Sequence, residues 1–144
     1  MKALFVMSLI FLVFFSCVKK NEKEAHIIYR IGFGYIELSF DESGHAKAKA
    51  GRGNSIDEDV FLAESTTDSI EFQIKNSKMF FTKLGELKEK QVESANSYTR
   101  TQIYLNDSLY YDTRRYSSNF SDLYSIISHE IPDEYNLFKT KRFN

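Results

Sequence analysis

Apolar and polar residues alternate along several stretches of the chain, and this two-residue period is typical of strands with one buried face. Residues 26–40 are rich in β-branched and aromatic side chains, which favour strands. Gly32 and Gly34 interrupt this run, which predicts a bulge or a close approach of another backbone segment. Turn residues at 41–44 and the alternating run HAKAKA at 45–50 predict a return strand, and therefore a hairpin.

Residues 68–74 alternate in the same way and predict a further strand. Runs at 97–105 and 109–115 flank Asn106, Asp107 and Ser108, and short polar turn residues between two such runs predict a second hairpin. In the first of these two runs, the less polar face is expected to point toward the core. That face carries Thr99, Thr101, Ile103 and Leu105.

Two other segments carry apolar residues at the spacing of an amphipathic helix. The first is capped by Asn76 or Ser77 and contains Gly85, which weakens it; the second is capped by one of the residues 117–119 and is stopped by Pro132. The apolar stripes consist of Phe80, Leu84 and Leu87 in the first helix and of Phe120, Leu123, Tyr124 and Ile127 in the second.

Residues 51–68 fit either of two structures. Ser55 and Glu58 have the spacing of a capping box that opens a short helix, and the segment also suits a long loop. The expected order is hairpin, strand, helix, hairpin, helix. This order predicts an α+β fold: a single small domain with an antiparallel sheet of about five strands and two helices packed on it.

The N-terminus has a different pattern, in which Lys2 precedes an uninterrupted apolar run from Ala3 to Phe15. As a helix this run spans about 20 Å, which is too short for a hydrocarbon core of about 30 Å. A positive start, a short apolar segment and a small residue at its end are typical of a secretory signal. The alternative, a buried strand or helix, lacks turn residues on either side.

The residues FFSC at 14–17 resemble the lipobox of bacterial lipoproteins. Ser16 and Cys17 fit that motif, whereas Phe14 and Phe15 stand where leucine and a small residue are usual. The resemblance implies cleavage before Cys17, a thioether-linked lipid on its sulfur and acylation, with palmitate for example, of its new amine. It places the protein in the cell envelope, anchored to a membrane, with the outer membrane of a Gram-negative bacterium as the expected site.

Cys17 is the only cysteine, so an internal disulfide is excluded and lipidation gives the residue a role. The expected organisation is a cleaved signal at 1–16, a tether at 17–25 and one domain at 26–144. The net charge is −1, and a near-neutral chain of this kind does not predict nucleic-acid binding.

Catalytic and metal-binding patterns were sought among the histidines and carboxylates. His26, His45 and His129 are not at metal-ligand spacing, and Asp57 and Asp59 lack the glycine and glutamate of an EF-hand. The interpretation is a non-enzymatic protein without a metal or cofactor. Two alternatives stay open, a hydrolase of the envelope with its site in the 51–68 loop and a purely structural accessory domain.

Tyrosine and arginine side chains crowd the second hairpin. These residue types are enriched at interface hot spots, and tyrosine also packs well across half-exposed strands. A binding face is therefore one prediction and cross-strand packing is the other. The predicted face consists of Tyr98, Arg100, Tyr104, Tyr110, Arg114 and Arg115.

Two further resemblances concern the order of elements and two serine positions. The order of elements, with Gly32-Phe33-Gly34 in the first strand pair, is similar to that of small bacterial lipoprotein domains of unknown function, although their Cys-Phe-Gly-x-Cys-Pro stretch is absent. Ser69 and Ser108 lie in Asp-Ser-aliphatic triplets that resemble O-glycosylation acceptors of exported proteins. Together these patterns predict an envelope lipoprotein that binds another macromolecule, with an immunity or inhibitor protein as one form of that role.

Overall fold

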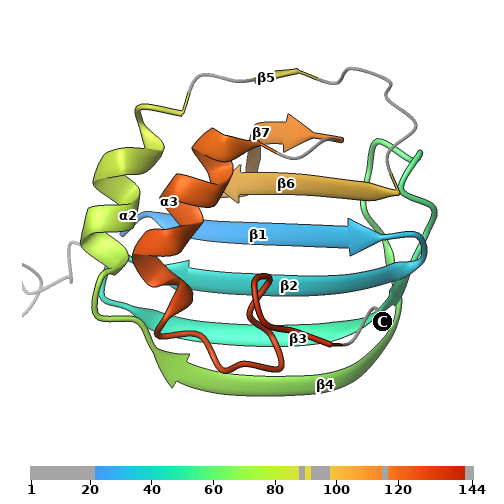
Figure 1. Ribbon diagram of the computed structural model, residues 1–144, viewed down its shortest axis with the longest axis horizontal. Coiled ribbons are helices and arrows are strands. Elements are labelled where there is room, and N and C mark those ends of the chain that lie inside the picture. The colour runs from blue at the N-terminus through green and yellow to red at the C-terminus, as the bar shows by residue number, and fades with distance from the viewer. Residues whose placement is uncertain (1–21, 88–89, 92–97, 115–116, 142–144) are drawn as a thin grey trace, which may run out of the picture.

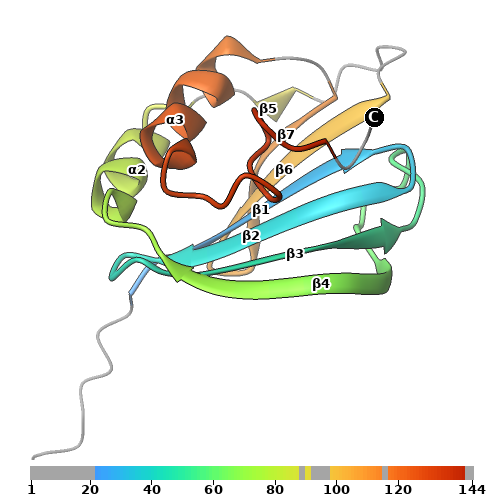
Figure 2. The same cartoon turned by 60° about the horizontal axis from the view of Figure 1, so that its bottom comes forward.

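Seven strands form one curved sheet, and two helices cover one of its faces (Figures 1 and 2). This is a computed structural model, and it describes residues 22–87, 90–91, 98–114 and 117–141. The elements are β1 (Glu24–Ile31), β2 (Gly34–Asp41), β3 (His45–Gly53), β4 (Ala63–Gln73), α2 (Ser77–Leu84), β5 (Lys90–Gln91), β6 (Thr99–Leu105), β7 (Ser108–Thr113) and α3 (Ser118–Ser128). The predicted α+β layout of a small domain with two helices on an antiparallel sheet is confirmed for these residues.

The strand order is β4-β3-β2-β1-β6-β7-β5, and β1 lies in the middle. Neighbouring strands are antiparallel, except that the short β5 runs parallel to β7. None of the helices in the described part of the chain is long and apolar enough to span a membrane.

The expected strand count of about five is wrong, mainly because of Gly32. Its φ of +56° lets the chain reverse at Gly32 and Phe33, so Ile31 pairs with Gly34 and the run 26–40 becomes two strands. The glycine therefore marks a turn and not a bulge in one strand. The short β5 accounts for the other additional strand.

The ambiguous segment contains neither a helix nor a loop of its full length. β3 extends to Gly53 and β4 begins at Ala63, so the loop is confined to Asn54–Leu62. Ser55 accepts a hydrogen bond from the backbone N–H of Asp57 (3.3 Å), and the Glu58 N–H donates to the Ser55 carbonyl (3.1 Å). These bonds form a local turn in place of the capping box.

Both helices bury the apolar stripes that the sequence predicts. Phe80 and Leu84 of α2 and all four predicted residues of α3 are buried, and Phe40 of β2 lies against Phe80 with 5.0 Å between ring centroids. The Ser117 Oγ caps α3 by accepting from the Phe120 N–H (3.2 Å). α2 ends at Leu84, immediately before Gly85, and α3 ends at Ser128, before Pro132.

The predicted second hairpin is confirmed, and its turn is Asn106-Asp107. Both residues have positive φ, 47° and 64°, as a two-residue turn between twisted strands requires. Ile103 is fully buried beneath the helices, as its place on the less polar face predicts. The alternate positions of β6, which include Arg100 and Gln102, therefore lie on the face of the sheet opposite the helices.

Candidate binding surface

Two arginines occupy neighbouring positions on the face of the sheet away from the helices. Arg30 of β1 and Arg100 of β6 are cross-strand partners, and each is only 1% exposed. The loop Asn54–Leu62 covers them. Because buried cations are unfavourable without partners, the contacts of these two side chains decide how the loop is held.

Arg100 has a complete set of acceptors. It binds both carboxylate oxygens of Asp112 on β7, with Nε–Oδ1 at 2.8 Å and Nη2–Oδ2 at 2.5 Å. Its Nη1 donates to the carbonyls of Ile56 (3.0 Å) and Glu58 (2.7 Å) in the loop. The hydrogen bond that Arg100 donates to Asp112 raises the pKa of Arg100 in spite of burial, so this guanidinium is charged.

Arg30 binds the loop through neutral acceptors. It donates to the carbonyls of Ser55 (3.2 Å) and Glu58 (3.1 Å) and to the side-chain oxygen of Gln102 (3.1 Å). Burial lowers the pKa of Arg30, and the nearby charge of Arg100 lowers it further. Its Nε is buried without a hydrogen-bond partner among the described residues, so the site has no spare acceptor.

Arg114 and the side-chain amides of Gln102 and Asn54 form further hydrogen bonds that hold the loop in place. Arg114 donates to a carboxylate oxygen of Asp57 (3.1 Å) and to its carbonyl (3.0 Å). Gln102 donates to the Asp59 carbonyl (3.2 Å), and the Asn54 side chain binds the backbone of Val60 (2.8 Å) and Leu62 (3.0 Å). Each residue from 55 to 59 therefore contributes a backbone carbonyl to a buried or half-buried side chain of the sheet or of Arg114 after β7, and these bonds hold the loop against the sheet.

This fixed loop displays two large apolar side chains, Val60 (67% exposed) and Leu62 (62%). Phe33 and Tyr98 are also exposed, and backbone hydrogen bonds bring their segments together with the loop. Gly53 donates to the Phe33 carbonyl (2.8 Å), Asn54 to the Leu62 carbonyl (3.0 Å) and Gly32 to the Tyr98 carbonyl (3.0 Å). We call Phe33, Val60, Leu62 and Tyr98 the distal apolar surface, because they lie at the end of β1 opposite Glu24, where the described chain enters the sheet (Figure 1).

Carboxylates border this surface. Asp57, Glu58 and Asp59 are exposed, and Asp57 and Asp59 form the outer ends of ion pairs with Arg114 (3.1 Å) and Arg100 (3.4 Å). The arginine ends of these pairs are buried or nearly so. The loop therefore presents negative charge to solvent while its positive partners lie beneath it.

The structure does not bring the sequence-predicted face together. Tyr98 is 83% exposed, but Arg100 is buried under the loop, which corrects its expected place on the surface. Tyr110 is on the helix side of the sheet, where its hydroxyl donates to the Leu84 carbonyl (3.1 Å). Tyr104 is half-buried, Arg114 is bound to Asp57, and Arg115 lies outside the described residues.

Phe33, Val60 and Leu62 were not among the binding residues predicted from the sequence. A signal was available, because the apolar triplet Val60-Phe61-Leu62 stands in an otherwise polar segment with no periodic partner. Arg30 and Asp112 were also not identified, although a charged residue within an apolar strand run indicates a buried ion pair.

The remaining predicted positions are scattered. Ser108 and Ser69 are exposed, and Cys17 lies outside the described residues. The histidines lie on three different elements: His26 on β1, His45 at the start of β3 and His129 at the C-cap of α3. No group of three or more His, Cys, Asp or Glu side chains in the described ranges is arranged to hold a metal ion.

Comparison of the chain with protein-family models, with curated protein sequences and with solved structures finds no significant match.

Proposed function

We propose that the protein is a non-enzymatic binding module of the bacterial cell envelope, anchored by lipid on Cys17 and engaging a partner protein through the distal apolar surface. The observation that carries this proposal is the loop Asn54–Leu62, which buried arginines hold in place while Val60 and Leu62 remain exposed. Single exposed apolar residues are common on proteins, but a group gathered at one end of a fold is typical of an interaction site.

Preorganisation gives the physical reason for this interpretation. Binding costs free energy when loops and side chains must be ordered, so a loop already fixed by the contacts of Arg30 and Arg100 binds at a lower cost. Tyr98 and Phe33 add the aromatic area that dominates many interface hot spots. The exposed Asp57 and Asp59 favour a partner whose contact region is apolar at its centre and basic at its edge.

The position of the surface suits a tethered protein. β1 carries the chain from Glu24 to the turn at Gly32, a distance of about 25 Å at ~3.3 Å per residue. A lipid on Cys17 would attach the molecule through its Glu24 end and leave the distal apolar surface pointing away from the membrane. The outer membrane of a Gram-negative bacterium is the proposed site, and an immunity or inhibitor role is one form of the proposed function.

The alternative hydrolase with a site in 51–68 has less support. The polar groups of this loop are used to bind the chain's own arginines and amides, as the bonds of Ile56, Glu58 and Asp59 show. These internal hydrogen bonds leave fewer polar groups of the loop for catalysis. They favour a structural role, in which the loop is a rigid support for exposed side chains.

A matched pair of variants tests the proposal. The full-length tagged protein is cross-linked in living cells and purified from membranes, as wild type, as Val60→Ser/Leu62→Ser/Tyr98→Ser and as the control Met79→Ser/Leu109→Ser. The control removes exposed apolar side chains elsewhere on the domain. We expect one protein to co-purify with the wild type and the control, and its recovery to fall at least about tenfold with the distal variant, since each lost hot spot costs 1 kcal/mol or more, roughly.

Circular dichroism and urea unfolding check that both variants are folded. We expect this result because the substituted side chains are exposed. Equal recovery with the distal variant and the wild type would show that the partner binds elsewhere. Equal loss with both variants would show that the capture depends on general surface hydrophobicity.

A further inference from the structure

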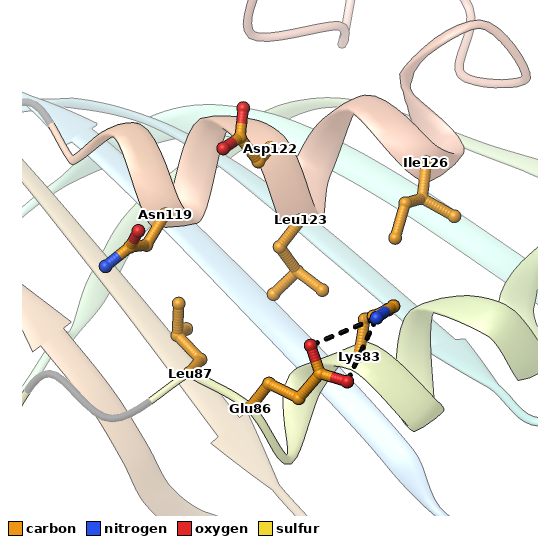
Figure 3. Close-up of a pocket in the computed structure, with 7 residues that line it drawn as sticks. All are labelled: Lys83, Glu86, Leu87, Asn119, Asp122, Leu123 and Ile126. Atoms are coloured by element: carbon orange, nitrogen blue, oxygen red, sulfur yellow. Dashed lines mark hydrogen bonds and ion pairs between the residues drawn. The ribbon is translucent and has the colours of Figure 1, made fainter.

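A cavity of about 380 Å³ lies between α2 and α3, where α2 ends and α3 begins (Figure 3). Its size is within the range of small-molecule sites. It is on the helix-covered side of the domain and shares no residue with the distal apolar surface. Its lining residues are Lys83, Glu86, Leu87, Asn119, Asp122, Leu123 and Ile126.

The two helices are joined at one end and separated at the other. Beyond α3, Glu130 accepts hydrogen bonds from the backbone N–H groups of Lys75 (2.5 Å) and Asn76 (3.1 Å), just before α2. The bonds of Glu130 therefore fasten the end of the helix pair that lies opposite the cavity.

The floor of the cavity is aliphatic. Leu87 and Leu123 are buried and Ile126 is half-buried, and Figure 3 shows the side chains of these three residues directed into the space between the helices. An alkyl chain placed there would contact three branched side chains and lose its contact with water, which is favourable in proportion to the area buried.

The rim carries an excess of negative charge. Lys83 Nζ is bound by both carboxylate oxygens of Glu86, at 3.0 and 3.1 Å, so these two groups neutralise each other. The exposed carboxylate of Asp122 forms no ion pair within the described part of the chain. Within the described ranges, a ligand group at the rim therefore meets one carboxylate that has no ion-pair partner, which favours a cation.

We propose that this cavity binds an aliphatic ligand with a cationic head, with the alkyl chain on Leu87, Leu123 and Ile126 and the head beside Asp122. The probes are octylammonium, octan-1-ol and octanoate, which have tails of the same class and heads of charge +1, 0 and −1. The protein is residues 17–144 with Cys17→Ser, which contains every described element and needs no detergent. Each probe is titrated at pH 7 and followed by amide chemical shifts.

We expect saturable shifts at the lining residues, with the lowest dissociation constant for octylammonium. Asp122→Asn should weaken octylammonium binding about two- to fivefold, as for one exposed ion pair, and leave octan-1-ol unchanged. Ile126→Trp should fill the cavity and abolish binding. Met79→Trp, which introduces the same residue at an exposed position of α2, should not abolish binding.

The inference is overturned if octanoate binds as tightly as octylammonium, or if the shifts lie outside the cavity or do not saturate. The Asp122→Asn comparison decides the role of charge even if Ile126→Trp disturbs the fold, because the Asp122 side chain is exposed and the substitution keeps its shape.

Discussion

Arg30 and Arg100 lie opposite each other on β1 and β6, so two guanidinium groups share a site that water does not reach. Asp112 is the only carboxylate buried with them among the described residues. Loop carbonyls, Gln102 and the side-chain oxygens of Asn54 and Asp59 supply the other acceptors. The sheet therefore needs the loop. Without it, N–H donors of both arginines would lose their acceptors and would be either buried without hydrogen bonds or exposed to solvent.

Removal of Asp112 should be strongly destabilising. Asp112→Ala leaves Arg100 buried without its carboxylate, and we expect the free energy of unfolding to fall by about 3–5 kcal/mol. Urea unfolding measures this change, with Asp112→Asn as a variant that keeps the shape of the side chain. The control Asp57→Asn removes an exposed partner, 79% exposed, and should cost less than about 1 kcal/mol.

The double variant Arg100→Met/Asp112→Leu separates charge from packing. Since an apolar pair of similar volume often replaces a buried ion pair without loss, it should recover most of the stability lost in Asp112→Ala. No recovery would mean that the arginine's bonds to Ile56 and Glu58, and not its pairing with Asp112, dominate the stability.

Sequence periodicity placed Arg100 on the correct face of its strand but could not show that the face is covered. Alternation reports which side chains share a face, and it carries no information about a covering loop whose Ile56 carbonyl lies 44 positions earlier in the chain. A different limit explains why Tyr110 was grouped with Tyr98. The register shift after Ile103 interrupts the strict alternation, and Tyr110 packs against the helix side.

At the scale of elements, the two helices are connected through one carboxylate. Glu130 follows α3 and binds the backbone N–H groups of Lys75 and Asn76 as well as the Asn76 side chain (2.7 Å). A negative charge before a helix also interacts favourably with its dipole. Asn76 itself makes no side-chain cap, so Glu130 takes over that function from a distant part of the chain.

Glu130→Ala should therefore lower the free energy of unfolding by about 1.5–3 kcal/mol, the range for hydrogen bonds to a charged group. Glu130→Gln keeps an acceptor and should cost less. Thermal or urea unfolding provides the measurement. Glu86→Ala, which breaks only a surface ion pair with Lys83, is the control and should change stability by less than about 1 kcal/mol.

β3 and β4 approach closely at Gly51 because glycine has no side chain. A Cβ on Gly51 would collide with the carbonyl oxygen of Ser65, next to a register shift in the ladder, so no larger residue fits without moving a strand. We expect Gly51→Ala to lower the free energy of unfolding by about 1–3 kcal/mol.

Gly85→Ala is the matched substitution in open space. Its φ is −62°, and the nearest atom to an added Cβ is the Thr82 carbonyl oxygen at 3.7 Å. It should stabilise the protein by about 0.4–1 kcal/mol by restricting the unfolded chain. In the same urea assay, the free energy of unfolding should fall with Gly51→Ala and rise with Gly85→Ala. A change of the same sign in both variants would contradict either the close contact at Gly51 or the open space at Gly85.

The helices and the second hairpin were predictable because their signals are local: a cap, a stripe of apolar residues and a turn residue tolerant of positive φ. Ser117 and the turn Asn106-Asp107 are examples. Gly32 shows the limit, since a glycine in an apolar run is compatible with a bulge or with a turn. The positive φ of Gly32 and the pairing of Ile31 with Gly34 in the structure distinguish the two.

At the scale of the molecule, the anchor and the distal apolar surface belong to opposite ends of one domain in the proposed arrangement. Cys17→Ser should move the protein from the membrane to the soluble fraction, because stable attachment in this proposal depends on acyl chains. Fractionation and intact mass measure this, with Ser16→Ala as a control that keeps a small residue before the cysteine. A wild-type protein without lipid mass would remove the basis for the proposed location.

The central place of β1 has a mechanical consequence. Its backbone hydrogen bonds to β2 and β6 run across the strand, so a pull between the Glu24 end of β1 and a partner bound at Tyr98 or the loop Asn54–Leu62 acts at right angles to them. Because the force enters through β1 and leaves through other strands, it loads the ladders in shear, and the bonds must yield together instead of opening one after another. A force applied along this axis would therefore meet more resistance than one that peels the strands apart in turn, and the domain would transmit tension between its two ends before it unfolds.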